Sequence, residues 1–296
     1  MLTHLRVDPV APERAVVIGA GGFVGGAIAR ALGARGVPVL ALARRDVDLL
    51  AADAADRLAA QLRPDDAVVA VAAKAPVKNP RMLADNVGMA EAIAAALRKQ
   101  PVAHLLNIGS DAIYADSRAP MTEAWPAAPT SLHGVMHLAR ELILAEAAGA
   151  APFASLRATL IYGLDDPHNG YGPNSFRRLA AAGKEIVLFG AGEELRDHIA
   201  VEDVAELAVR IVLHRSRGAL NAVTGQVVSF ADIARWTVAH FPKAPPVRTT
   251  VRTKPMPHDG YRAFDVAAMR AAFPDFTPIA PEAGIGRTCS ATKEGN

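Results

Sequence analysis

Three regularly spaced glycines follow the first apolar run of the chain. Gly19, Gly22 and Gly25 form a GxxGxxG pattern between residues 15–20, which have the composition of a buried strand, and a helical stretch. Glycine permits a tight turn and lets the backbone approach a pyrophosphate, which can then bind at the helix N-terminus. Glycine clusters often serve only as turns, but this position between strand and helix favours a dinucleotide-binding loop. The residues expected to contact the cofactor there are Gly19, Gly22, Phe23, Val24 and Gly25.

The end of the second predicted strand carries two arginines. The chain reads Ala43-Arg44-Arg45, with no acid at the point where one would bind the ribose hydroxyls of an adenosine. Forked cationic donors there favour a 2′-phosphate, so we expect NADP, with NAD as the alternative if the arginines are only solvated loop charges. Asp48 and Leu49 follow, where an acid and an apolar residue could contact adenine.

The elements that must position these residues alternate in type. Apolar strand-like runs are separated by helical stretches, which predicts an α/β fold with a doubly wound parallel sheet of the Rossmann type. The predicted strands are residues 15–20, 37–42, 66–73, 104–110 and 153–163. Beyond Gly163 the segments are shorter and mixed, which predicts a smaller substrate region over the carboxyl ends of the strands.

These patterns divide the chain into regions. We expect a dinucleotide-binding domain over 1–165, with return segments near 195–225, and a substrate-binding region over 166–194 and 226–286. Residues 287–296 are polar and are expected to form a disordered tail, with Cys289 as a surface thiol.

Composition limits the classes of protein to which the chain can belong. It has 296 residues, 51% of them apolar, a formal net charge of +2 and one cysteine. Charges of both signs are interspersed, so no nucleic-acid surface is indicated. No apolar run is long enough for a signal peptide or a membrane span, and the single cysteine favours a reducing compartment. We therefore expect a cytoplasmic protein.

Several motifs together resemble the NAD(P)-dependent epimerase/dehydratase family, the extended short-chain dehydrogenases. They are the glycine loop, Asp85-Asn86-Val87, Ile108-Gly-Ser110-Asp111-Ala-Ile-Tyr114, Arg157-Ala-Thr-Leu-Ile-Tyr162-Gly163, residues 186–209, and Tyr261-Arg262-Ala-Phe-Asp265. Residues 43–73 look particularly like the sugar-nucleotide 4-ketoreductases.

The resemblance implies a nucleotide-sugar substrate and a set of site residues. Ala72 and Asn86 would contact the cofactor, Ser110 would hydrogen-bond the reacting oxygen, and Arg196 and Arg262 would pair with the diphosphate. Further substrate contacts would come from Asp111, Asn174 and, beside the nucleobase, Phe189. Members of the family often pair through the helix that carries Asn86 and the helix over 132–147, and the apolar breadth of 132–147 is compatible with such a homodimer.

The chain departs from the family at the two residues of its Tyr-x-x-x-Lys motif. The framing residues Pro129, Ser131, Gly134 and Glu141 match, which fixes the register, but His133 and His137 occupy the Tyr and Lys positions. One interpretation makes His133 the acid/base, since imidazole transfers protons near neutral pH, with His137 contacting the cofactor ribose.

Two other interpretations remain open for this pair. The site could bind its ligands without turnover or use another acid, for which Asp111, Tyr114 and His168 are candidates. Alternatively, histidines at i and i+4 could chelate a metal ion, but no third ligand is evident, so no metal is expected. The leading hypothesis is thus an NAD(P)-dependent reductase or epimerase with Ser110, His133 and His137 as catalytic residues. Its rival is a non-catalytic sensor of the same ligands.

Overall fold

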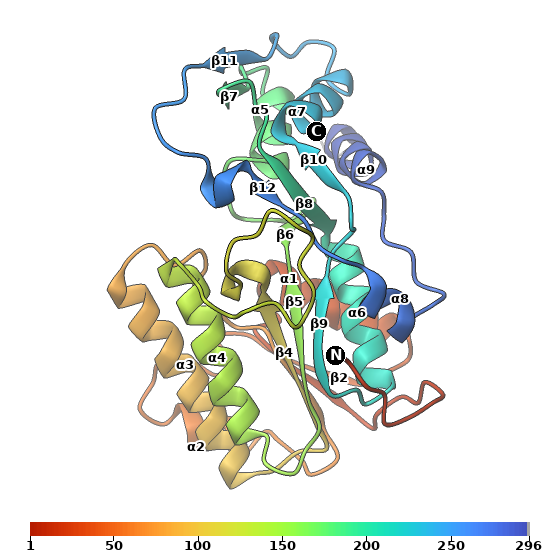
Figure 1. The fold of residues 1–296 in the computed structure, drawn as a ribbon. Helices are drawn as coiled ribbons and strands as arrows, with labels where there is room; N and C mark the ends of the chain where they lie inside the picture. Colours follow the sequence, from red (N-terminus) through yellow and green to blue (C-terminus); the bar gives the residue numbers. More distant parts are fainter. Residues whose placement is uncertain (295–296) are drawn as a thin grey trace.

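A six-stranded parallel sheet forms the core of the computed structural model, which describes residues 1–294 (Figure 1). The strand order is β2-β1-β3-β4-β5-β9, and every pairing in it is parallel. The strands are β1 (Ala15–Ile18), β2 (Val39–Leu42), β3 (Ala67–Ala70), β4 (His104–Ser110), β5 (Phe153–Ala158) and β9 (Gly218–Ala222). The order changes direction between β1 and β3, so a ligand-binding crevice is expected beyond their carboxyl ends. The predicted doubly wound α/β fold is confirmed.

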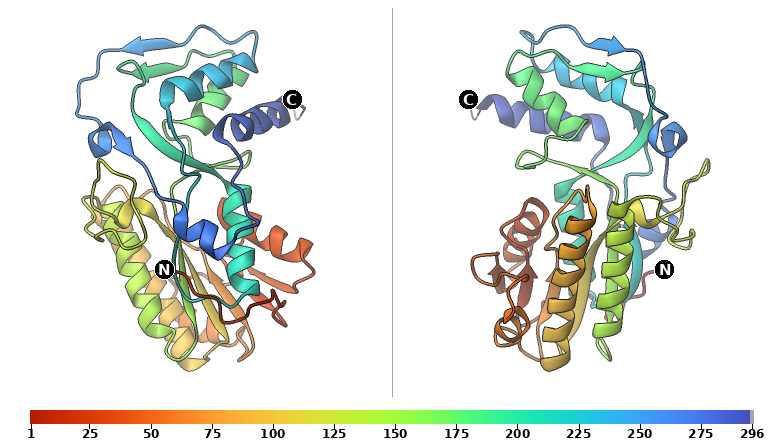
Figure 2. Two further views of the ribbon diagram at one scale, coloured as in Figure 1. Left: turned by 45° about the vertical axis from the view of Figure 1, so that its right-hand side comes forward. Right: turned by 90° about the vertical axis from the view of Figure 1, so that its left-hand side faces the viewer.

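Helices cover both faces of this sheet, which explains why its strands are apolar on both sides. Val17 packs toward one face, under α1 (Phe23–Ala34) and α6 (Val201–Leu213). Its neighbours Val16 and Ile18 pack toward the other face. That face is covered by α2 (Ala54–Ala59), α3 (Pro80–Lys99) and α4 (Leu132–Ala147), as Figures 1 and 2 show.

Local capping fixes where the two long helices begin. Asn79 accepts a hydrogen bond from the Met82 amide at 3.0 Å, and Pro80 occupies the first turn of α3. Ser131 accepts from the Gly134 amide at 3.1 Å at the start of α4. Such caps satisfy amides that a helix start leaves without a partner. The Ser131 cap therefore sets the register of the two histidines that follow it.

A second, smaller lobe lies above the carboxyl ends of the parallel strands (Figure 1). Its mixed sheet has β8 at the centre, with β10 antiparallel to it and β6 and β12 parallel. The elements of this lobe are β6 (Leu160–Tyr162), α5 (Pro173–Ala181), β7 (Val187–Phe189), β8 (Leu195–Ala200), β10 (Val227–Ser229), α7 (Phe230–Ala239), β11 (Arg248–Thr250), β12 (Tyr261–Arg262) and α9 (Pro281–Glu294). Two 3₁₀ turns, η1 (Asp111–Ile113) and η2 (Pro257–Gly260), and a short helix, α8 (Ala267–Ala272), complete the chain.

Two predicted segments divide between the lobes. The strand expected over 153–163 splits at Thr159, whose hydroxyl donates to the Asp197 carbonyl at 3.0 Å, so β5 stays in the parallel sheet while β6 joins β8. The return segment expected near 195–225 also splits. Its β8 belongs to the small sheet, whereas α6 and β9 complete the large domain.

The expected disordered tail is wrong for the described residues. α9 continues through Glu294, and Cys289, expected as a surface thiol, is fully buried with Ile285 in the core of the second lobe. Burial raises the pKa of this thiol to about 11. The helix has few large apolar residues. A Cβ on Gly284 would lie 1.9 Å from the Tyr162 hydroxyl, so glycine permits that close packing. Residues 295–296 of the predicted tail lie outside the described residues.

Through residue 294, the chain forms no helix with the length and apolarity needed to cross a membrane.

Candidate active site

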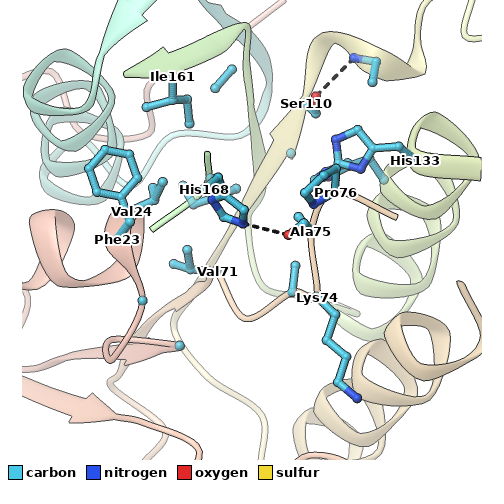
Figure 3. Close-up of a pocket in the computed structure, with 18 of the residues that line it drawn as sticks. Phe23, Val24, Val71, Lys74, Ala75, Pro76, Ser110, His133, Ile161 and His168 are labelled. Carbon is cyan, nitrogen blue, oxygen red and sulfur yellow. Dashed lines mark hydrogen bonds between the residues drawn. The ribbon is translucent and has the colours of Figure 1, made fainter. Parts of the chain in front are cut away.

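A cavity of about 1220 Å³ opens at the carboxyl ends of the parallel strands, below the second lobe. One end, here called the glycine-loop end, is formed by Gly19 and residues 21–25. The other, the α4 end, is formed by Ser110, His133, His137 and Arg140. In Figure 3, Phe23 and Val24 lie on the side opposite Ser110 and His133. The cavity thus joins the two groups of residues that the sequence singled out.

Close backbone contacts determine the shape of the glycine-loop end. Gly19 has φ +98°, and a Cβ there would lie 2.6 Å from the Ala72 nitrogen. A Cβ on Gly25 would lie 2.2 Å from the Gly19 carbonyl oxygen. Only glycine fits both positions, so α1 approaches β1 closely and begins at the cavity, with no side-chain cap on Gly22. The open helix N-terminus suits an anionic group such as a pyrophosphate.

The four residues predicted for the adenosine side all line the cavity. Arg44 and Arg45 have side chains 74% and 89% exposed, and Leu49 is buried. Asp48 accepts hydrogen bonds from the Leu50 amide at 3.1 Å and from Arg44 at 3.0 Å, and these contacts lower the pKa of its carboxyl. Both arginines are thus exposed at this side of the cavity, although Arg44 already pairs with Asp48.

Asn86 lies one layer behind the cavity lining. Its carbonyl accepts from the Lys74 amide at 2.8 Å, and its own amide donates to the Lys74 and Met82 carbonyls at 3.0 and 2.7 Å. The sequence predicted a cofactor contact, but the structure shows Asn86 holding the loop that follows β3. Ala72, in that same loop, does line the cavity.

Two of the expected catalytic residues line the cavity from the C-terminal end of β4 and the N-terminal end of α4. Ser110 ends β4, where its hydroxyl accepts from the Ala112 amide at 3.2 Å and lies 3.3 Å from the Asp111 carboxylate. His133 is in the first turn of α4, with Nδ1 3.5 Å from the Val77 amide. The helix can approach because a Cβ on Gly134 would lie 2.1 Å from the Ala112 carbonyl oxygen.

Burial keeps both histidines in the neutral form. Desolvation lowers the pKa of His133, and the nearby Asp111 carboxylate only partly opposes this. Desolvation also holds the pKa of His137 well below its usual value, with His133 and Arg140 adding to the effect. The two rings meet edge to face, with centroids 4.7 Å apart. Within residues 1–294, the buried Nδ1 of His137 has no hydrogen-bond partner.

The two arginines expected to bind a diphosphate differ in position. Arg196 lines the cavity and pairs with Glu194 at 3.1 Å. Arg262 is 2% exposed and does not line it. Its guanidinium donates to the Asp111 carboxylate at 2.5 Å and to Asp116 at 3.1 Å, 151 and 146 residues away in sequence. Arg262 therefore positions Asp111, which does line the cavity, instead of facing a ligand.

Of the remaining two residues predicted to contact the substrate, only one lines the cavity. Asn174 is buried and lines the cavity, donating to Asp166 at 2.5 Å. Phe189 is 52% exposed, lies outside the lining, and packs against Tyr171, whose ring centroid is 4.9 Å away. Tyr171 contributes to the cavity wall in its place.

The alternative acids have contrasting environments. His168 faces Asp166 through Nδ1 at 2.9 Å and the Ala75 carbonyl through Nε2 at 2.7 Å, so it bridges the two lobes across the cavity (Figure 3). Burial raises the pKa of Tyr114 to about 12, and its hydroxyl donates to Asn221 at 2.7 Å. Sequence reasoning missed Asp166, which has no motif, and Arg140, which lies seven residues after His133.

Across residues 1–294, His, Cys, Asp and Glu side chains form no group of three that could hold a metal ion.

Comparison with known proteins agrees with this geometry. The profile of the NAD dependent epimerase/dehydratase family matches residues 15–223. The dTDP-L-rhamnose 4-epimerase of Burkholderia thailandensis is 35% identical over 134 residues, which cover 42% of this chain and 36% of that relative.

Two solved structures share the fold over nearly the full chain. The UDP-glucose 4-epimerase of Thermus thermophilus, in complex with NAD, has a TM-score of 0.83 at 25% identity and covers 96% of this chain and 100% of its own. A GDP-L-fucose synthetase of Naegleria fowleri, bound to NADP, also has a TM-score of 0.83, at 18% identity, and covers 99% of this chain and 97% of its own. With a family profile that extends over more than half of its length, this chain belongs to the NAD dependent epimerase/dehydratase family.

Proposed function

We propose that the chain is an NAD(P)-dependent enzyme that reduces or epimerises a nucleoside-diphosphate sugar, with His133 as its acid/base. The observation that carries this proposal is the cavity itself. It joins a glycine loop that fits a pyrophosphate to the Ser110 hydroxyl and the His133 imidazole. The NAD bound by the Thermus epimerase and the NADP bound by the Naegleria synthetase support the cofactor class.

The cofactor fits the residues present. A Cβ on Gly19 or Gly25 would overlap backbone atoms, so glycine at these positions lets the N-terminus of α1 begin close to β1, at the cavity. We assign the pyrophosphate to this loop and the adenosine to the side that carries Arg44 and Arg45. These two arginines favour NADP, since a 2′-phosphate requires cationic donors. When bound, the nicotinamide ring supplies or accepts a hydride.

The chain's own residues would then handle the proton. In reduction, the carbonyl carbon gains hydride and its oxygen takes a proton from His133, while the Ser110 hydroxyl hydrogen-bonds that oxygen. In oxidation, neutral His133 removes the proton from the sugar hydroxyl. Epimerisation would use both directions in sequence. Because burial lowers the pKa of His133, the ring is ready as a base at neutral pH but must first gain a proton to act as an acid.

The substrate side of the cavity offers Arg196, Asn174 and Asp111. A guanidinium suits the diphosphate of a nucleotide sugar, and buried polar groups suit its hydroxyls. The rhamnose and glucose epimerases to which the chain is similar act on sugars of this class, as their names state. A homodimer through α3 and α4 remains a prediction.

Incubation with NADPH and a panel of nucleotide-linked 4-ketosugars tests the proposal. Loss of reduced cofactor with one 4-ketosugar supports the reductase. In a parallel incubation with the oxidised cofactor and nucleotide sugars that carry a hydroxyl at the same carbon, interconversion of two epimers without net cofactor reduction supports the epimerase. A non-catalytic sensor is the second candidate, favoured by the two neutral histidines at the Tyr and Lys positions. Binding of both ligands without turnover of any sugar would favour that sensor over the enzyme.

A further inference from the structure

Arg140 is a buried cation at the α4 end of the cavity. It lies three residues after His137 and seven after His133, a spacing that places all three on one face of the helix. Its side chain lines the cavity, yet the residue is only 3% exposed. The guanidinium donates to the Ala70 carbonyl at 2.5 Å and to the Val71 carbonyl at 3.4 Å.

The charge of Arg140 has no anionic partner in the part of the chain that the structure describes. Its Nε is buried without any hydrogen-bond partner among these residues. Arg157, by contrast, pairs with Glu141 at 2.5 Å. Burial lowers the pKa of Arg140 to about 10, so it still carries its charge at neutral pH. A buried cation held only by two carbonyls is costly unless a ligand compensates it.

Arg140 is hydrogen-bonded to the backbone that runs from the α4 end of the cavity to its glycine-loop end. The Val71 and Ala72 amides both donate to the Ile18 carbonyl at 2.9 Å, so the backbone beside Arg140 continues directly to the glycine loop. The strand order β2-β1-β3-β4 places the adenosine side at β2 and the pyrophosphate loop at β1. An extended dinucleotide would therefore have its nicotinamide half at β3 and β4, where Arg140 and His137 lie.

We propose that Arg140 supplies the positive charge that binds the nicotinamide half of the dinucleotide, through its ribose or pyrophosphate oxygens. His137, at the position of the family's lysine, is neutral and cannot supply this charge. Arg140 lies three residues after His137 on the same face of α4, so its cation can take the place of the family's lysine. This assignment rests on the dinucleotide binding of the proposed function, and it makes Arg140 a binding residue for which no family motif signals a role.

Titration of the full chain with NADPH, followed by the fluorescence of the reduced nicotinamide, tests this assignment. Adenosine 2′,5′-bisphosphate serves as a second probe, because it lacks the nicotinamide half of the dinucleotide. Arg140→Met should weaken NADPH binding about 10-fold or more, the usual effect of losing a charge-assisted hydrogen bond. It should leave binding of the bisphosphate unchanged. Arg140→Lys should retain most of the NADPH affinity.

Relocating the charge provides an independent test. His137→Lys/Arg140→Met restores one cation to the same helix face and should bind NADPH more tightly than Arg140→Met alone. Urea unfolding without ligand completes the set. Removal of an uncompensated cation should leave the free energy of unfolding unchanged or raised, whereas a purely structural arginine would lower it.

Three results would overturn the assignment. They are wild-type NADPH affinity in Arg140→Met, equal weakening of both probes together with lower urea stability, and a double variant that binds no better than Arg140→Met. If the wild type binds neither NADPH nor NADH, the proposed function fails first and the role of Arg140 with it. If the wild type binds but Arg140→Met is indistinguishable from it, only the role of Arg140 fails.

Discussion

At both ends of the cavity a glycine lets a helix approach the neighbouring backbone closely, but the two ends differ in the groups that face a ligand. At the glycine-loop end, a Cβ on Gly25 would lie 2.2 Å from the Gly19 carbonyl oxygen, and at the α4 end a Cβ on Gly134 would lie 2.1 Å from the Ala112 carbonyl oxygen. Both helices are therefore docked closely. We expect the first end to bind its ligand through backbone amides and the second through side chains.

This difference would account for the predicted replacement of the family's Tyr and Lys at the α4 end alone. A backbone amide cannot be substituted, so a change at the glycine-loop end would disturb the turn itself. Side chains on α4 can change while Ser131 and Gly134 keep the helix in place. Helix position and proton chemistry are thus encoded by different residues. The prediction that His133 and His137 stand at the Tyr and Lys positions requires only such side-chain changes.

Gly25→Ala should have the largest effect, because it pushes the α1 start away from Gly19. We expect dinucleotide binding to be lost, and kcat/KM to fall by more than about 100-fold, since displacements near 1 Å at a site can have effects of that size. Gly33→Ala is the matched control in the same helix, because a Cβ added there would have no heavy atom within 4 Å. It should bind normally and gain about 0.5–1 kcal/mol of stability. Equal NADPH binding by both variants would contradict the role given to the loop.

Gly134→Ala should separate binding from turnover. The added methyl would push α4 from Ala112 and so move His133 relative to Ser110. Turnover should fall about 100-fold by the same geometric argument. Binding of adenosine 2′,5′-bisphosphate should not change, because that ligand lacks the nicotinamide half and does not reach the α4 end. A matching loss of bisphosphate affinity would show that the two ends are not independent.

The pH dependence should identify the α4 end as the source of the proton. A reduction needs protonated His133, and burial holds the pKa of this ring below 6.5. The protonated fraction therefore decreases as pH rises, and the single-turnover rate of reduction should fall about 10-fold per pH unit above that pKa. NADPH affinity should stay flat over the same range. His133→Tyr should abolish this decline near neutral pH, since tyrosine remains protonated to about pH 10. An unchanged decline in that variant would assign the proton to another group.

The smallest effect is expected at the exposed arginines of the adenosine side. Arg44→Ala or Arg45→Ala should weaken NADPH about 10-fold while leaving NADH almost unchanged, because only NADPH carries the 2′-phosphate. Arg35→Ala is a suitable control, since Arg35 is a partly exposed arginine paired with Glu206 at 2.8 Å and outside the cavity lining. Equal weakening of NADPH and NADH would show that these arginines do not select the cofactor.

Local patterns were enough to predict the parts of the molecule whose contacts are close in sequence. The glycine loop lies between β1 and α1, and the Ser131 cap fixes α4, so both could be placed from neighbouring residues. Arg262 shows the limit of this reasoning. Its motif suggested a phosphate ligand, but its carboxylate partners come from a segment about 150 residues earlier in the chain, and no local signal reveals them.

Burial was the other property that sequence could not supply. α9 has few large apolar residues, and only the packing of Gly284 on Tyr162 and the burial of Cys289 show that it is part of the second lobe. Arg140 has the spacing of an inward-facing residue, but an arginine in an alanine- and leucine-rich helix is equally compatible with a solvated charge. Its missing anionic partner becomes visible only once the described residues are placed together.

Side-by-side turnover of the wild type and His133→Phe, with NADPH and the nucleotide-linked 4-ketosugar that the panel identifies, tests the central claim most directly. Phenylalanine keeps a ring on α4 but cannot carry a proton. If His133 is the acid, turnover should fall about 10²- to 10⁴-fold, the usual contribution of general acid catalysis, while NADPH affinity stays close to that of the wild type. Turnover that persists unchanged in His133→Phe would contradict the account.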